Sequence, residues 1–149
     1  MGAKVIIRKA NSNDIQVMTA LLAELFTIEN DFNIDKDKQL RGLELLFQSQ
    51  DSIIFVAETF ERVIGMISMQ SMISTVMGGY VGLIEDMIVT SEFRGQGIGK
   101  QLLTMMIEES IRLGYTRLTL GADLRNIPAI SFYKTSGFEP SNMGLMYRI

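Results

Sequence analysis

Apolar residues recur at helical spacing in the first part of the chain. Asn11 stands where a helix N-cap is expected, with Asp14 three positions later. From there to about residue 28, apolar positions repeat every three or four residues, which predicts a helix. Further leucines predict a second helix that ends near Ser49, and the acidic stretch 29–37 between the two helices is predicted to be a loop.

β-branched and apolar runs predict strands in the middle of the chain. Residues 52–59 and 63–72 are two such runs, and the three residues between them predict a hairpin. A third run, at 80–89, is apolar almost throughout and is interrupted by two acidic residues. With the short run at 5–7, these segments predict a sheet at the centre of the fold.

The second half of the chain adds a long helix and three short elements. An amphipathic helix is predicted over 97–113, and Gly114 follows it where a left-handed C-cap is expected. A strand, a short helix and a terminal strand are predicted at 117–120, 128–136 and 145–149. The order β-α-α-β-β-β-α-β-α-β predicts a single mixed α/β domain over residues 1–149.

The composition excludes several kinds of chemistry. The chain has 149 residues, of which 47% are hydrophobic, enough for one core. The net charge of -3 argues against binding nucleic acid by charge alone. Because the chain has no His and no Cys, we exclude disulfides, cysteine nucleophiles and Ser-His-Asp hydrolysis, and we expect no metal. Acid–base work is left to Asp, Glu, Lys or Tyr.

The same sequence predicts where the protein works. It shows no signal peptide, and its longest apolar runs, such as 53–57, are far shorter than the roughly 20 residues that span a bilayer. We therefore expect a cytoplasmic location and no membrane contact. The exposed edges of a small sheet are compatible with a homodimer.

A glycine-rich turn, RGQGIGK at 94–100, precedes the amphipathic helix. Such a turn presents free backbone N–H groups at the positive end of the helix dipole, which indicates an anion site. The spacing does not fit a Walker A loop, because Arg94 and Gln101 stand where Gly and Ser or Thr are needed. It does not fit a dinucleotide fingerprint either, because Lys100 replaces the third glycine.

The spacing Arg-x-x-Gly-x-Gly at 94–99 resembles the acyl-CoA pyrophosphate loop of the GNAT superfamily of N-acyltransferases. The strand at 84–89 is also similar to the strand that precedes this loop in the family. Ser91 differs, since the family often has Pro there. The specific resemblance covers 80–138 and ends in a stretch with Asn126, Ala129, Phe132, Tyr133, Gly137 and Phe138.

The resemblance implies a mixed, mostly antiparallel sheet flanked by helices, and direct transfer of an acetyl group from acetyl-CoA to a bound amine in a ternary complex. The absence of Cys and His agrees with direct transfer, because a covalent acyl-enzyme is then hard to build. The resemblance also implies that pantetheine pairs with the backbone of Met87, Ile88 and Val89. The other implied cofactor-binding residues are Arg94, Gly95, Gln96, Gly97, Ile98, Gly99, Lys100, Asn126 and Tyr133.

The candidate catalytic residues are Glu85 and Tyr133. Glu85 interrupts an apolar strand, where partial desolvation would raise the pKa of its carboxyl toward that of a general base. Strand alternation places Glu85 and Asp86 on opposite faces, and we prefer Glu85 for the substrate side. The Tyr133 phenol stays protonated at neutral pH and can protonate the leaving thiolate. The alternatives are that Glu85 pairs with a cation and that Tyr133 packs beside Phe132 in the core.

Other assignments stay open at this stage. Asn126 either bonds pantetheine, as the resemblance implies, or caps the helix that follows it. The acidic stretch 29–37 either favours a cationic acceptor or is simply solvated. The acceptor is a polyamine, another small amine, an amino acid or a protein amino group. Two rival functions are a non-catalytic acyl-CoA-binding sensor and a nucleotide-binding protein that uses the same turn.

Overall fold

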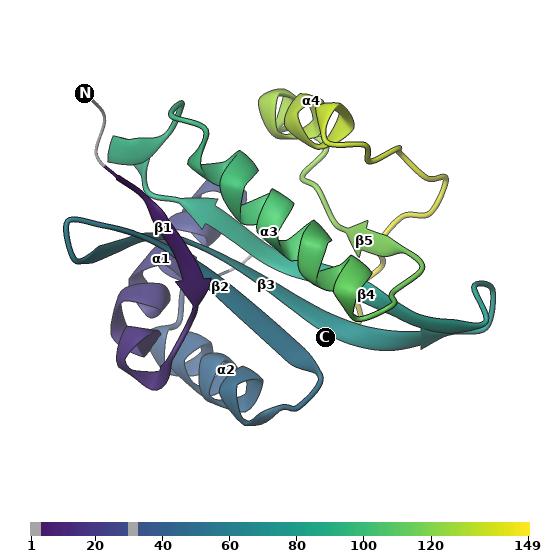
Figure 1. Ribbon diagram of the computed structural model, residues 1–149, viewed down its shortest axis with the longest axis horizontal. Helices are drawn as coiled ribbons and strands as arrows, with labels where there is room; N and C mark the ends of the chain where they lie inside the picture. The colour runs from purple at the N-terminus through teal and green to yellow at the C-terminus, as the bar shows by residue number, and fades with distance from the viewer. Residues whose placement is uncertain (1–3, 30–32) are drawn as a thin grey trace.

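A five-stranded sheet forms the centre of the molecule (Figure 1). The computed structural model describes residues 4–29 and 33–149. The strands lie side by side in chain order, and neighbours are antiparallel except for the last pair, which is parallel. This confirms the mixed, mostly antiparallel sheet. The strands are β1 (Ile6–Lys9), β2 (Ser52–Thr59), β3 (Arg62–Ser74), β4 (Gly79–Val89) and β5 (Leu118–Leu120).

Helices cover both faces of the sheet. On one face, α1 (Ile15–Glu29) and α2 (Lys36–Gln48) enclose a core built around Met18 and Leu43. On the other face, α3 (Ile98–Arg112) packs through Leu102 and Met106, and α4 (Ile127–Thr135) lies beside it (Figure 1). The sheet is therefore the middle of three layers. None of the helices within residues 4–29 and 33–149 is long and apolar enough to cross a membrane.

The helix ends follow the expected capping chemistry. Asn11 and Asp14 form a capping box around a 3-10 turn that leads into α1. Asp35 caps α2 by accepting from the N–H groups of two residues in its first turn, so this helix begins four residues earlier than the first leucine that predicted it. Gly114 has φ +79° directly after α3, which confirms the left-handed C-cap. The predicted acidic loop is correspondingly shorter, and Asp31 lies outside the described residues.

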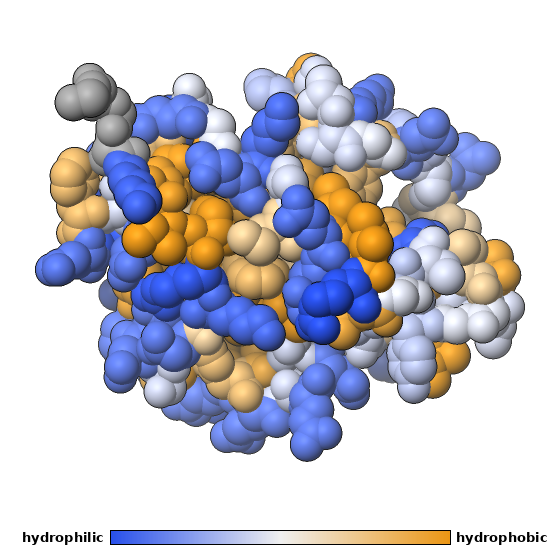
Figure 2. Space-filling view, in the orientation of Figure 1, coloured by the Kyte–Doolittle hydropathy of each residue, from blue (hydrophilic) through white to orange (hydrophobic). Residues whose placement is uncertain are grey.

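One face of α3 differs from the prediction. In the amphipathic pattern that predicts a helix over 97–113, Ile111 belongs to the apolar face, but its side chain is exposed, whereas Ser110 is buried. Ser110 satisfies its hydroxyl by donating to the Ile107 carbonyl at 2.7 Å, so a polar residue is accommodated there. Leu113, which follows α3, is also exposed. Figure 2 shows apolar surface beside the C-terminal half of this helix.

The predicted terminal strand at 145–149 is wrong. Residues 136–149 contain no helix or strand, and the element order ends with α4. Leu145 and Met146 are 78% and 95% exposed, although Leu145 runs past Gly121 at the end of β5. Apolar residues with strand propensity form a strand only where a neighbouring edge and a covering layer are available. The exposure of Leu145 and Met146 shows that this segment has no covering layer.

Candidate active site

A β-bulge interrupts β4 at its two acidic residues. On the neighbouring strand β3, Ile67 pairs with Met87 and Met69 pairs with Ile84, so Ser68 alone faces two residues of β4. As a consequence, Ile84 and Met87 both pack into the core under α3, although they are three positions apart. The regular alternation that assigned Glu85 and Asp86 to opposite faces is therefore wrong at this point.

The two carboxylates at the bulge differ in environment. Glu85 is exposed, whereas Asp86 is partly buried beside Ser68, whose hydroxyl oxygen accepts a bond from the Asp86 N–H at 3.3 Å. Burial, with repulsion from Glu85 as a second cause, raises the pKa of Asp86 to about 6, against a smaller lowering by Ser68. Asp86 thus has a carboxyl suited to exchange protons near neutral pH.

Strands β4 and β5 separate beside this bulge. They pair only from Gly82 to Ile84 on β4 and from Leu118 to Leu120 on β5, while β4 continues to Val89. The edge of residues 85–89 that faces away from β3 is consequently not covered by a strand in the described parts of the chain. An extended molecule can pair with a strand edge of this kind through backbone hydrogen bonds.

The glycine turn after β4 presents backbone N–H groups that bond no acceptor in the part of the chain that the structure describes. Gly95 and Gly97 have φ values of +76° and +79°, and Gly97 is the N-cap of α3. The Gln101 N–H bonds the Gly97 carbonyl at 3.1 Å, but the N–H groups of residues 95–100 find no acceptor within residues 4–29 and 33–149. These N–H groups at a helix N-terminus can together bind a phosphate.

Gly99 allows three elements to meet beside this turn. A Cβ at this position would lie 3.2 Å from the Met87 methyl group of β4 and 3.9 Å from the Phe132 ring of α4. The first helical turn of α3 therefore approaches the open part of β4 closely because residue 99 has no side chain.

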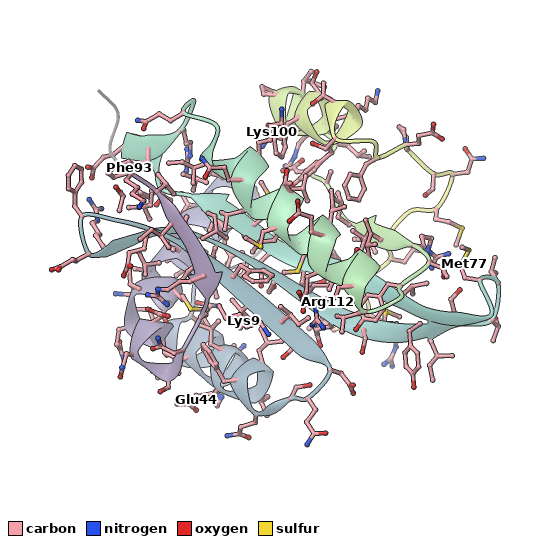
Figure 3. The ribbon with its side chains drawn as sticks, viewed as in Figure 1. Lys9, Glu44, Met77, Phe93, Lys100 and Arg112 are labelled. Carbon is pink, nitrogen blue, oxygen red and sulfur yellow. The ribbon has the colours of Figure 1, made fainter. Side chains whose placement is uncertain are left out.

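The side chains of the predicted phosphate loop have distinct roles. Ile98 is buried in the core, so only its backbone can reach a ligand. Gln96 is exposed. Lys100 lies on the first turn of α3, well away from Met77 at the far end of the sheet (Figure 3). A surface hollow of about 340 Å³ adjoins Lys100 and is lined also by Ile7, Gly97, Gln101, Thr104, Met105 and Glu108.

Arg94 is already engaged by the protein. Its Nε donates to the Val89 carbonyl at 2.8 Å, and its Nη2 donates to the Glu24 carboxylate at 2.7 Å. The sequence did not indicate Glu24, which lies 70 positions away on α1. The guanidinium that was predicted to bind the cofactor thus holds the turn in this structure.

Tyr133 lies in an aromatic cluster on α4. Its ring centre is 5.3 Å from that of Phe132 and 6.1 Å from that of Phe138, and the cluster packs on the core that contains Met87. Burial, and to a lesser extent the negative charge of Glu29, raises the pKa of the Tyr133 phenol. The core packing anticipated as an alternative is present, and it keeps the phenol protonated over a wide pH range.

Asn126 caps α4. Its side-chain oxygen accepts from the Ala129 N–H at 3.2 Å, which confirms the capping alternative. The NH₂ group of the same side chain is a separate donor, so capping leaves it available for a ligand.

Arg125, which the sequence did not single out, ties α1 to the loop before α4. Its Nε donates to Asp123 at 2.9 Å, and its Nη2 donates to the Glu29 carbonyl at 2.5 Å. The contact brings Glu29, at the end of α1, to the side of the molecule that carries Tyr133. Such a long-range contact leaves no periodic signal in the sequence.

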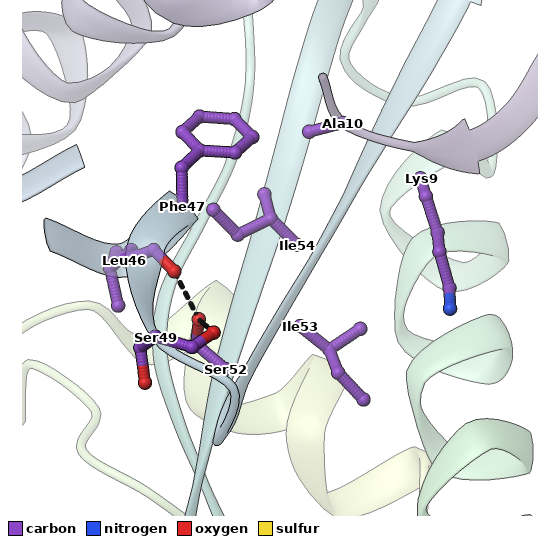
Figure 4. Close-up of a pocket in the computed structure, with 8 residues that line it drawn as sticks. All are labelled: Lys9, Ala10, Leu46, Phe47, Ser49, Ser52, Ile53 and Ile54. Carbon is purple, nitrogen blue, oxygen red and sulfur yellow. Dashed lines mark hydrogen bonds between the residues drawn. The ribbon is translucent and has the colours of Figure 1, made fainter. Parts of the chain in front are cut away.

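A smaller hollow of about 140 Å³ lies elsewhere, between α2 and the start of β2 (Figure 4). The Ser52 hydroxyl donates to the Leu46 carbonyl beside it and fastens the end of α2 to the sheet. Lys9 is the one charged residue among the eight that line it, so this hollow lacks the acid–base groups that gather around β4.

Comparison with known proteins agrees with this geometry. The model of the Acetyltransferase (GNAT) family matches residues 18–138. An aminoalkylphosphonate N-acetyltransferase of Salmonella typhimurium is 27% identical over 136 residues, which are 91% of this chain and 86% of that protein.

Solved structures share the fold over almost the whole chain. A transcriptional regulator from Bacillus halodurans C-125 has a TM-score of 0.87 and 27% identity, with 98% of this chain and all of that one covered. The aminoglycoside N-acetyltransferase AAC(6')-Iy in complex with CoA has a TM-score of 0.84 and 21% identity, with 100% and 97% covered. The family match spans the bulge, the glycine turn and α4, and the chain therefore belongs to the GNAT family of acetyltransferases.

Proposed function

We propose that this protein transfers an acetyl group from acetyl-CoA to a primary amine by direct attack in a ternary complex. The observation that carries the proposal is the uncovered edge of β4, which leads directly into a turn with unpaired N–H groups at 95–100. A strand edge followed by an anion site matches the shape of an extended pantetheine arm that ends in a diphosphate.

The cofactor is held mainly by backbone groups in this proposal. The edge of Met87, Ile88 and Val89 pairs with pantetheine, and one N–H of that edge stabilises the oxyanion that forms at the thioester. The N–H groups of residues 95–100 receive the diphosphate, with Lys100 nearby as a cation. The NH₂ group of Asn126 adds a donor for the pantetheine amides.

The carboxylates at the bulge accept the proton of the attacking amine. Glu85 is exposed and reaches the amine directly or through a water molecule, while Asp86, with a pKa of about 6, supplies a base matched to neutral pH. Because Glu85 raises the pKa of Asp86, the two titrate as a coupled pair. This role depends on the bulge, because there Glu85 and Asp86 both lie opposite Ser68 and do not follow the regular alternation of a strand.

Tyr133 donates a proton to the departing thiolate. The amine nitrogen forms a bond to the thioester carbon, the carbon–sulfur bond breaks, and the CoA sulfur takes the phenolic proton. A thiol has an ordinary pKa of about 8.5, so a phenol of higher pKa is still protonated when the thiolate leaves. The raised pKa of Tyr133 supports this assignment.

The charges near the bulge favour a cationic amine as acceptor. Glu85 and Asp86 are acidic, and the negative charge of Glu29 is close enough to act on Tyr133. The Salmonella relative acts on aminoalkylphosphonates and the CoA-bound neighbour on aminoglycosides, and both substrate classes carry primary amines. We therefore propose a small polyamine or another small amine as the substrate class.

Two measurements test the function. Calorimetric titration with CoA should show binding, and acetyl-CoA with a panel of amines should release free thiol faster than acetyl-CoA alone. Binding without amine-stimulated release would support the sensor alternative instead, and competition by ATP would support a nucleotide-binding protein. A single domain over residues 1–149, a cytoplasmic location and a homodimer stay predictions, the last to be checked by light scattering.

A further inference from the structure

The carboxylate of Glu24 on α1 binds the turn that follows β4 at three points. One oxygen accepts from the Thr90 hydroxyl at 3.0 Å. The other accepts from the Ser91 N–H at 2.9 Å and from Arg94 Nη2 at 2.7 Å. The three donors fall within five residues, directly before the glycine turn.

Arg94 connects this carboxylate to the end of β4. While its Nη2 bonds Glu24, its Nε donates to the Val89 carbonyl at 2.8 Å. Val89 is the last residue of the strand edge that is proposed to hold pantetheine. Glu24 and Arg94 together fix the direction in which the chain leaves that edge, and so fix where residues 95–100 lie.

These contacts join elements from opposite faces of the sheet. Glu24 belongs to α1, whereas the turn leads into α3, which covers the other face (Figure 1). The side chains of Glu24 and Arg94 are 30% and 43% exposed, and exposed ion pairs add little to the stability of a fold. Gly95 and Gly97 both adopt positive φ, and glycine restricts the backbone less than other residues do, so contacts from Glu24 can limit the conformations open to this turn.

We propose that Glu24 is a positioning residue for acetyl-CoA, which holds the phosphate-binding turn in register with the β4 edge through Arg94. The inference rests on the proposed function. It also makes a prediction of opposite sign to the simpler role for Arg94. If the guanidinium bound phosphate itself, Glu24 would compete for it, and loss of the Glu24 charge would tighten CoA binding.

The test compares Glu24→Gln with Glu92→Gln. Glu92 lies in the same turn and loses the same charge, but it pairs with Arg62 at 3.4 Å, with side chains 66% and 52% exposed. For Glu24→Gln we expect the dissociation constant of CoA and the KM for acetyl-CoA to rise ~10-fold, as for the loss of one charge-assisted hydrogen bond, with kcat within about twofold. Glu92→Gln should match the wild type in all three quantities.

A double variant tests whether Glu24 acts through Arg94. Arg94→Gln should weaken CoA binding to a similar degree, and the double variant should be no weaker than the poorer single variant by more than about twofold. Additive losses, unchanged binding or tighter binding by Glu24→Gln would each overturn the inference. Wild-type protein that gives no heat with CoA would instead overturn the proposed function, and the inference with it.

Discussion

At the scale of single residues, the bulge on β4 decides which groups can do chemistry. Strand alternation is the only rule available from the sequence, and it separates Glu85 from Asp86. The extra residue opposite Ser68 removes this separation. The sequence could identify both carboxylates as unusual within an apolar strand, but it could not show which one is buried, because the pairing with β3 decides that.

Asp86→Asn should stabilise the protein while it impairs catalysis. A carboxyl whose pKa is raised in the folded state makes folding less favourable as pH rises from about 4 through 6, and the full cost is present above that range. The rise in the pKa of Asp86 from 3.8 to about 6 lowers the free energy of unfolding by up to about 3 kcal/mol above that pH range. Thermal unfolding should therefore show a higher Tm for Asp86→Asn at about pH 8 and little difference at about pH 4.

The pH dependence of kcat separates the two carboxylates. In the pH profile of kcat, the wild type should lose activity below a pH of about 6, the pKa of Asp86. This acidic limb of the profile should be absent from the residual activity of Asp86→Asn. In Glu85→Gln the limb should move to lower pH, because the repulsion that helps to raise the pKa of Asp86 is gone. A limb that stays in place in both variants would exclude Asp86 as the titrating base.

Tyr133→Phe should separate catalysis from binding. The substitution keeps the ring that packs between Phe132 and Phe138 and removes only the hydroxyl. We expect kcat to fall ~100-fold while the dissociation constant of CoA changes by less than about twofold. Phe132→Leu tests the packing alone and should affect Tm more than the rate. Full turnover by Tyr133→Phe would mean that another group protonates the thiolate.

At the scale of elements, the two ends of α3 carry the same backbone feature for different reasons. Gly97 and Gly114 both have φ +79° and open space where a Cβ would point. Gly97 begins the helix inside the glycine turn that is proposed to bind phosphate, and Gly114 follows the other end of the helix. The need for a positive φ can therefore be tested at Gly97, which lies in the proposed binding turn, and at Gly114, which lies outside it.

Gly97→Ala and Gly114→Ala should lose similar stability, on the order of 1–2 kcal/mol, because both force an alanine into the left-handed region. The loss of CoA affinity should be confined to Gly97→Ala, whose shifted backbone moves the N–H groups of the turn. Chemical denaturation measures the first effect and calorimetry the second. Equal CoA binding by the two variants would mean that the turn does not hold the diphosphate.

Most elements could be predicted to within a few residues, because local signals define them. Such signals are the cap at Asn11 before α1, the cap at Gly114 after α3, and the helical spacing of apolar residues within each helix. The hairpin between β2 and β3 follows from the two β runs that flank it, although the turn residues Phe60 and Glu61 both adopt a positive φ that their residue types do not favour. The terminal strand at 145–149 failed because a strand depends on a partner edge, which no local pattern reports.

The site was only partly predictable for the same reason. The glycine turn, Tyr133 and the acidic pair can each be found from spacing. The contacts of Glu24 with Arg94 and of Arg125 with the Glu29 carbonyl join residues 70 and 96 positions apart. They depend on how α1 lies against the sheet, and a single sequence contains no periodic trace of them.

At the scale of the whole molecule, three layers meet at one corner. Helix α1 contributes Glu24 and Glu29, the sheet contributes the bulge, and the opposite layer contributes the turn and Tyr133. The two hydrophobic cores lie on separate faces of the sheet. A change in how α1 packs should therefore reach the glycine turn through Glu24 and Arg94, without passing through the core under α3.

The strand β5, which precedes α4, is the shortest strand of the sheet. The strand that leads to α4 pairs with β4 over only three residues, and within residues 4–29 and 33–149 no strand lies beside that edge of β4 beyond them. CoA that pairs with β4 there would act as a temporary sixth strand. It would stabilise α4 against local unfolding from the sheet. Amide hydrogen exchange in α4 should slow when the protein is saturated with CoA, while exchange in α2 on the far face keeps its rate. The enzyme would then finish its own folding each time it loads its acetyl donor.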